Sequence, residues 1–127
     1  MRSMATLVAA CGLLFSWTPA SERLAAQAPA YPHAFPRTGV TQILDNVRVT
    51  VWEVNWRHGD KQPVHRHLYD MAGVYLRYGP ITVTALDGTE NKGAEFPVPR
   101  PYFQPKGITH REEAVTPGAP ERLAIMV

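Results

Sequence analysis

The feature that most limits the fold is the lack of helical periodicity after residue 28. In residues 29–127, no run of ten or more residues repeats its apolar positions with the 3.6-residue period of a helix. Short segments with alternating apolar and polar residues occur instead, and the 11 prolines and 8 glycines of residues 29–127 interrupt them often. Many short alternating segments with turn residues between them are typical of a β-sandwich or barrel. The pattern therefore predicts an all-β domain.

The clearest alternation runs from Val47 to Trp56, where β-branched and aromatic residues dominate. The Asp87-Gly88 dipeptide predicts a hairpin, since glycine readily adopts the positive φ that such turns need. Four prolines or glycines in residues 29–39 predict an extended lead-in without regular structure. We expect strands over residues 47–56, 64–68, 71–78, 81–86, 109–115 and 123–127, with short extended pieces near Phe96 and from Tyr102 to Gln104.

The first 28 residues have the pattern of a secretory signal peptide. Arg2 precedes an apolar run from Ala5 to Phe15, which is shorter than the roughly 20 residues of a membrane-spanning helix. Ala26-Gln27-Ala28 has the small-x-small form of a cleavage site. We expect a signal peptide over residues 1–28, one domain over residues 29–127, and a periplasmic or secreted protein; the alternatives are cleavage at Ala20 and lipidation of Cys11.

Charge and cysteine content exclude several classes of function. Residues 29–127 contain 11 basic and 10 acidic side chains without a basic cluster, so nothing predicts binding to nucleic acid or an anionic membrane. Cys11 is the only cysteine, which leaves the expected mature chain without a disulfide, a thiol nucleophile or a thiolate metal site. A domain this small folds marginally alone, and burying part of its surface in a homodimer would stabilise it.

Three histidines form the candidate metal site. His65 and His67 are two residues apart on an expected strand, so their side chains project to the same side. His110 follows the turn residues Pro105 and Gly107. Three imidazoles bind zinc, iron, copper or nickel and leave coordination positions free for other ligands. The residues therefore predict one divalent transition metal, with Fe, Mn, Ni, Cu and Zn all open.

These histidines also lie within two patterns that resemble those of a known family. The stretch from Gly59 through His65 and His67 to Gly79 resembles the first motif of the cupins. The stretch from Pro99 through Pro105 and Gly107 to His110 resembles their second motif, and the two stretches together cover about half of residues 29–127. The resemblance implies a small jelly roll, or double-stranded β-helix barrel, that brings the three histidines together.

The chain departs from the cupin pattern in one metal ligand. The family's first motif places a glutamate three or four residues after its second histidine, and Met71 and Ala72 occupy those positions here. The nearest acid, Asp70, falls one residue early. We expect a site of three histidines alone, and the alternative is a tightened turn that brings Asp70 inward. Pro99 and Ala114 replace a glycine and an asparagine of the motifs at structural positions.

The resemblance implies a small secreted metal-dependent oxidoreductase, dioxygenase-like, acting on a small organic molecule. The same fold also hosts other chemistries, so isomerisation and hydrolysis stay open. The alternative from another class is a module that binds a metal or a small ligand without transforming it. Turnover in an oxygen-uptake assay separates these hypotheses.

The sequence also predicts roles for several other polar and aromatic side chains. Tyr102 and Gln104 share one strand face and are the candidate substrate-binding residues. Glu112 shares the face of His110, where it would orient the imidazole or transfer protons, although a solvated Glu112-Glu113 pair is the simpler interpretation. His58 and His33 are expected to be solvated rather than ligands. Core or rim packing is the simplest expectation for five aromatic residues, Trp52, Trp56, Tyr75, Tyr102 and Phe103.

Overall fold

The computed structural model describes residues 30–127. The predicted signal peptide lies outside these residues. All regular elements of the described part are β-strands, and none of its segments is a helix of the length and hydropathy needed to span a membrane. The nine strands are β1 Val40–Asp45, β2 Thr50–Trp56, β3 His65–Arg66, β4 Met71–Arg77, β5 Thr82–Ala85, β6 Glu90–Asn91, β7 Arg100–Gln104, β8 Thr109–Glu113 and β9 Arg122–Met126.

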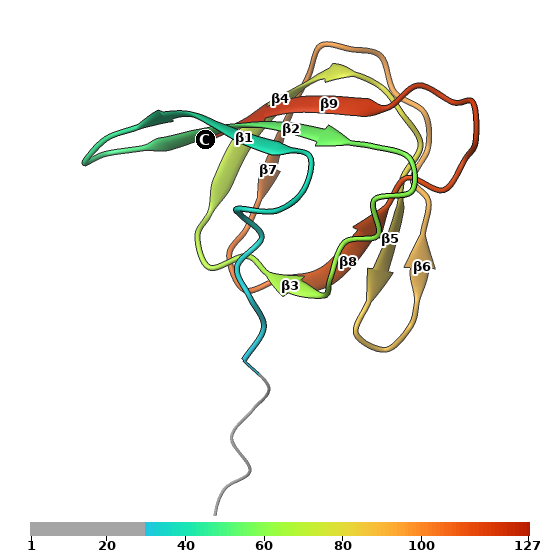
Figure 1. Ribbon diagram of the computed structural model, residues 1–127, viewed down its shortest axis with the longest axis horizontal. Helices are drawn as coiled ribbons and strands as arrows, with labels where there is room; N and C mark the ends of the chain where they lie inside the picture. The colour runs from blue at the N-terminus through green and yellow to red at the C-terminus, as the bar shows by residue number, and fades with distance from the viewer. Residues whose placement is uncertain (1–29) are drawn as a thin grey trace, which may run out of the picture.

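The strands form two sheets that lie one above the other (Figure 1). The upper sheet has the order β1-β2-β9-β4-β7, and the lower sheet has the order β3-β8-β5-β6. All strand pairs are antiparallel, and each sheet joins strands from both halves of the chain. The predicted all-β fold is confirmed.

Period-two alternation explains which residues fill the space between the sheets. Val54 and Trp56 of β2 are buried, whereas Glu53 just before them is exposed and Asn55 between them is half-buried. On β9, Ala124 and Met126 are buried and lie on the same face. Successive side chains of a strand point to opposite faces, so each strand contributes every second residue to the interior.

The start of the predicted strand 47–56 was wrong. A tight turn around Asn46 separates β1 from β2, and the side-chain Oδ1 of Asn46 accepts hydrogen bonds from the backbone nitrogens of Arg48 and Val49. Val47 is fully exposed at this turn. Asparagine side chains stabilise turns in this way, and the valines around it gave a strand pattern that the turn overrides.

The proline-rich lead-in lacks regular strands, as predicted, but its role in packing was not foreseen. Ala34 and Phe35 belong to the hydrophobic core, with exposed fractions of 1% and 5%. The ring of Phe35 packs on Trp52 with centroids 5.4 Å apart. This segment therefore closes one side of the space between the sheets.

The turn at Asp87-Gly88 is confirmed. Gly88 has a φ of +86°, which favours glycine over residues with a Cβ atom. The backbone nitrogen of Gly88 donates to the carbonyl of Ala85, and the nitrogen of Ala85 donates to the carbonyl of Thr89. The turn joins β5 to β6. No strand forms near Phe96, which lies between β6 and β7.

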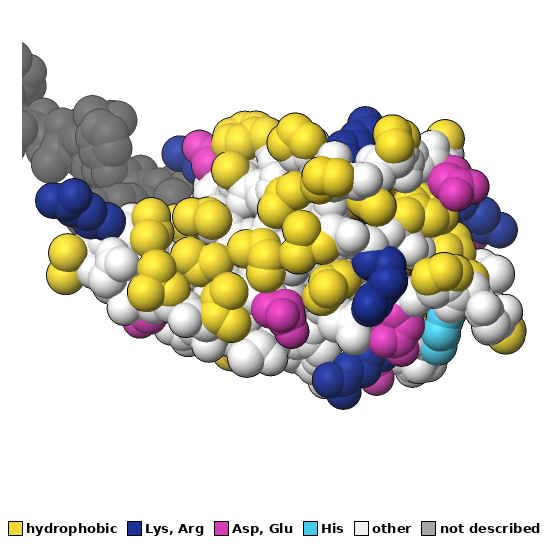
Figure 2. All heavy atoms as spheres, turned by 90° about the horizontal axis from the view of Figure 1, so that it is seen from above, with side chains coloured by type: hydrophobic (Ala, Val, Ile, Leu, Met, Phe, Trp, Pro, Cys, Tyr) yellow, Lys and Arg dark blue, Asp and Glu magenta, His cyan; other side chains and the backbone are white. Residues whose placement is uncertain are grey.

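The outer face of the upper sheet is largely apolar. Figure 2 shows this side of the molecule, where hydrophobic side chains gather with few charged groups between them. Leu44, Leu76 and Phe103 on this sheet are between 46% and 63% exposed. The expected packing of Phe103 in the core or rim was therefore wrong. The homodimer stays a prediction.

Candidate metal centre

Strand pairing brings two of the three histidines together. His65 of β3 lies directly opposite His110 of β8 in the antiparallel register, so their side chains point to the same face. His67 follows β3 and is held by its backbone: its nitrogen donates to the carbonyl of Ile108, and its carbonyl accepts from the nitrogen of Gly107. Gly107 has a φ of +90°, so the turn before β8 depends on glycine.

The three imidazoles meet inside the bowl formed by the two sheets. One ring nitrogen from each of His65, His67 and His110 lies within 4.8 Å of the others. The Nε2 atoms of His67 and His110 are 3.1 Å apart. All three residues are at least nine-tenths buried. The prediction that the fold brings these histidines together is confirmed.

The surroundings keep the histidines neutral. Burial lowers the pKa of His65 and His110 below the usual 6.5. Burial and the neighbouring imidazoles lower the pKa of His67 to about 4. Neutral imidazole is the form that binds metals.

The free Nε2 of His65 fits a metal ion. His65 Nδ1 donates a hydrogen bond to the carbonyl of Pro63 at 3.1 Å, so its Nε2 carries the lone pair. That Nε2 is buried and has no hydrogen-bond partner among residues 30–127. A hydrogen bond from the other ring nitrogen is what usually orients a metal-binding histidine. The three histidines could therefore hold one metal ion together.

No acid from the turn after His67 joins this cluster. Asp70 is exposed, and its Oδ1 accepts a hydrogen bond from the backbone nitrogen of Lys106 at 2.8 Å. Met71 is buried instead, with its sulfur 3.3 Å from His67 Nδ1. The turn thus directs a thioether inward and the carboxylate of Asp70 outward, which agrees with the expected three-histidine set.

Glu112 is the acid that faces the histidines, and the prediction that it is solvated was wrong. Its side chain is 12% exposed, and its Oε1 lies 3.7 Å from His110 Nε2. Its Oε2 accepts hydrogen bonds of 2.8 Å from Arg37 Nη2 and Trp56 Nε1. Burial raises the pKa of Glu112, but Arg37, His110 and the Trp56 hydrogen bond outweigh that effect and hold the pKa at about 2. The carboxylate is therefore ionised.

Sequence reasoning missed Arg37. This residue lies in the proline-rich lead-in, yet its side chain is only 7% exposed and forms an ion pair with Glu112 across 75 positions of the chain. Its guanidinium lies 5.5 Å and 5.6 Å from the ring centroids of Phe35 and Trp56. A lone arginine among prolines carries no periodic signal, so only the position of β8 in space could identify it.

The two candidate substrate-binding residues lie beside this group. Tyr102 and Gln104, together with His67, Arg37 and Glu112, line a cavity of about 20 Å³ inside the bowl. Both residues are half-buried on β7. The structure thus places them next to the histidines, and their contact with a substrate stays a prediction.

The remaining histidines stand apart from the cluster. His58 is not solvated as predicted: it is half-buried, and its Nε2 donates to the carbonyl of Ala119 at 2.6 Å. His33 accepts a hydrogen bond from the backbone nitrogen of Leu68. Neither belongs to the group that could hold a metal ion.

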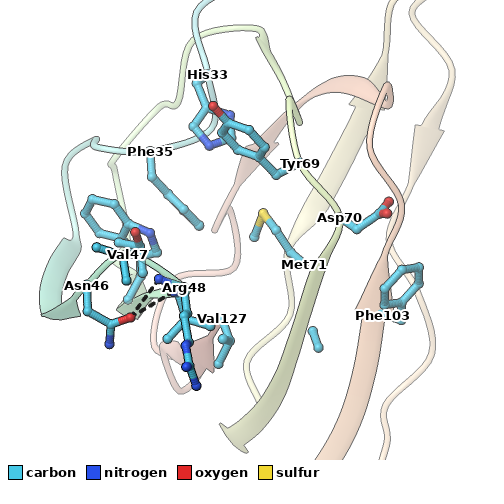
Figure 3. Close-up of a pocket in the computed structure, with 14 residues that line it drawn as sticks. His33, Phe35, Asn46, Val47, Arg48, Tyr69, Asp70, Met71, Phe103 and Val127 are labelled. Atoms are coloured by element: carbon cyan, nitrogen blue, oxygen red, sulfur yellow. Dashed lines mark hydrogen bonds between the residues drawn. The ribbon is translucent and has the colours of Figure 1, made fainter.

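A larger pocket of about 530 Å³ lies outside the bowl, between the β1–β2 turn and the start of β4 (Figure 3). Met71 points into this pocket, and the rings of Phe35 and Tyr69 stand beside it. Phe35 also lines the small inner cavity, and Met71 contacts His67. These two side chains therefore separate the outer pocket from the histidines.

Comparison with known proteins supports the fold. No protein-family model and no curated protein matches the chain. Among solved structures, a cupin domain from Bordetella pertussis Tohama I aligns with a TM-score of 0.54 and 24% identity, over 77% of this chain and 94% of that one. An RmlC-like cupin family protein with a double-stranded β-helix fold, from Methanocaldococcus jannaschii, aligns with a TM-score of 0.49 and 13% identity, over 77% and 87% of the two chains.

Proposed function

From a chain with the cupin fold and three buried histidines that meet inside it, we propose a metal-dependent cupin that oxidises a small organic molecule. The observation that carries the proposal is the convergence of three imidazole nitrogens within 4.8 Å. Converging neutral imidazoles are costly to bury unless something binds their lone pairs. A divalent transition metal is the ligand that this donor set suits best.

His65, His67 and His110 would hold the metal. A bound transition metal with open positions supplies Lewis acidity and, if it is redox-active, a route for electrons to an oxidant. The carbonyl of Pro63 orients His65 through its Nδ1 proton. Phe35 and Met71 limit water access from the outer pocket. The chain thus prepares a partly dry site without needing a protein nucleophile.

A second candidate is a module that binds a metal or small ligand and does not transform it. The pKa of Glu112, at about 2, favours this alternative, because so weak a base is a poor proton acceptor near neutral pH. Among the described acids, Glu112 is the one within 4.0 Å of a cluster histidine. Oxidation does not require a protein base, so this observation leaves both candidates testable.

The experiment begins with elemental analysis of protein purified without chelator, where one equivalent of transition metal is expected. His110→Ala should lower the affinity for that metal by about 100-fold or more, because two imidazoles satisfy the ion's coordination poorly. His58→Gln is the matched control and should leave affinity unchanged, since His58 lies outside the cluster. Equal metal binding by both variants would rule out the proposed centre.

Oxygen uptake then separates the two candidates. Metal-loaded protein is tested against diketones, phenols and small acids, with His110→Ala as the inactive control. Consumption of oxygen with loss of one compound supports the oxidase-type function. A compound that binds tightly and is recovered unchanged supports the binding module.

We also propose that the protein acts outside the cytoplasm, based on Arg2, the apolar run that follows and the Ala26-Gln27-Ala28 sequence. Protein recovered from the cell envelope or the medium should then begin at Pro29. A start at a lipidated Cys11 would support the lipoprotein alternative, and cytosolic protein that retains Met1 would contradict export.

A further inference from the structure

Besides Nε2 of His65, three polar atoms inside the bowl have no hydrogen-bond partner in the described part of the chain. They are Nε and Nη1 of Arg37 and the hydroxyl oxygen of Tyr102. Arg37 has its side chain more than nine-tenths buried. A buried donor without a partner is costly, so such donors are usually satisfied by water or by a ligand.

These donors border one space. Arg37 and Tyr102 both line the inner cavity of about 20 Å³, together with His67 and Gln104. A space of about 10–15 Å³ holds one water-sized group, so the cavity admits one or two oxygen atoms. The cavity therefore joins unpartnered donors to the imidazole cluster within one compartment.

The charges around the inner cavity determine whether a neutral or an anionic ligand fits there better. Glu112 already neutralises Arg37 through its ion pair of 2.8 Å, and the three imidazoles are neutral. A divalent ion held by the histidines would leave both of its positive charges uncompensated in the bowl. Buried charge is unfavourable unless it is paired, so an anionic ligand fits better than a neutral one.

Tyr102 is built to donate rather than to accept. Burial raises the pKa of its hydroxyl above the usual 10, so the proton stays on the oxygen. Its ring is stacked on Tyr75 with centroids 4.4 Å apart. A fixed neutral hydroxyl and a guanidinium with free N–H groups are the donors that proteins use for a carboxylate.

We propose that the ligand of this site is a small carboxylic acid, whose carboxylate oxygen is bound by Arg37 and Tyr102 next to the histidines. The inference rests on the proposed function, because the uncompensated charge comes from the bound metal. It deepens that function by naming the substrate class. Arg37 in the lead-in and Tyr102 on β7 both line the inner cavity.

The experiment measures binding in zinc-loaded protein by calorimetry, so that no turnover is required. Acetate and propionate are the probes, and acetamide and propionamide are the neutral compounds of the same shape. The acids should bind at least about tenfold more tightly than the amides. Tyr102→Phe should weaken acetate binding at least about fivefold, the loss expected for one hydrogen bond to a charged group.

Two further variants provide a control and a second test of carboxylate binding. Tyr69→Phe is the matched control, because Tyr69 is exposed and does not line the inner cavity, and it should leave acetate binding unchanged. Arg37→Lys keeps the positive charge beside Glu112 but loses the planar fork of donors, so it should weaken acetate binding as well. Thermal unfolding checks that each variant is folded, and Arg37→Lys supplies the test if Tyr102→Phe is unfolded.

The outcomes separate the two proposals. Protein that binds zinc but binds acetate no better than acetamide, or whose Tyr102→Phe variant binds acetate normally, overturns this inference and leaves the metal centre intact. Protein that binds no zinc and no other transition metal overturns the proposed function and this inference together. Selective acetate binding that weakens in Tyr102→Phe, or in Arg37→Lys if Tyr102→Phe is unfolded, supports the inference.

Discussion

Two buried arginines define two different regions of the interior. Arg37, beside the histidines, is paired with Glu112 and keeps two buried nitrogens without partners in the described chain. Arg122, on β9, has no acid within 4.0 Å among residues 30–127. Its guanidinium lies between 5.2 Å and 5.6 Å from three ring centroids instead, those of Tyr75, Tyr78 and Phe96.

The comparison shows which of the two buried arginines only stabilises the fold. Arg122 donates from Nε to the carbonyl of Gly79 at 2.8 Å, and cation–π contacts satisfy the rest of its charge. Arg37 is paired with the buried carboxylate of Glu112, and its Nε and Nη1 donors still have no partner in the described chain. The region around Arg122 is complete without a ligand, whereas the region around Arg37 is arranged to receive one.

The largest effect should come from removing one half of the ion pair. Arg37→Met leaves the carboxylate of Glu112 buried without its partner, which typically costs about 3–5 kcal/mol of unfolding free energy. Chemical denaturation of metal-free protein measures the loss. The double variant with Glu112→Gln should recover most of it. A loss below about 1 kcal/mol would remove the distinction between the two arginines.

The next effect is the pH dependence of stability in the histidine region. The pKa of His67 is about 4 in the folded protein and near 6.5 in the unfolded chain, so the unfolded state binds more protons between these values. The unfolding free energy of metal-free protein should therefore fall as pH drops from 6.5 toward 4, by about 3 kcal/mol from His67 alone. Denaturation at pH 7 and at pH 4.5 measures this loss.

Arg122→Leu should keep that pH dependence, because arginine does not titrate in this range. Its own cost should be smaller, about 1–3 kcal/mol, since it removes cation–π contacts and one hydrogen bond but leaves no buried acid unpaired. Zinc affinity should match that of the parent. A tenfold loss of zinc affinity in this variant would show that the two regions are not independent.

The smallest effect marks the edge of the histidine region. Asp70→Ala removes one hydrogen bond, to the backbone of Lys106, and should cost about 1 kcal/mol or less. Metal content should remain that of the parent, because the Asp70 carboxylate points away from the cluster. Loss of metal from a folded Asp70→Ala protein would place this acid among the ligands.

The sequence predicted the strands best where alternation was regular and failed where turns or bulges interrupted it. Residues 81–86 alternate and were predicted as one strand, and β5 occupies Thr82–Ala85. Strand β1 was not predicted, since a bulge between Gln42 and Leu44 breaks its register and disturbs the alternation. Local pattern cannot show a bulge, because the partner strand decides where the extra residue goes.

For the site, the sequence alone determined the three histidines, the turns that place them and the misfit of Asp70. Those features depend on spacing along a strand and on glycine and proline in turns, which are local properties. Only the tertiary structure decided three other features. They are the contacts of Glu112 with Arg37 and Trp56, the position of the Tyr102 hydroxyl at the same cavity, and the aromatic rings around Arg122. Each of these joins residues that are 20 or more positions apart, and a contact of that kind exists only once the two sheets have packed together.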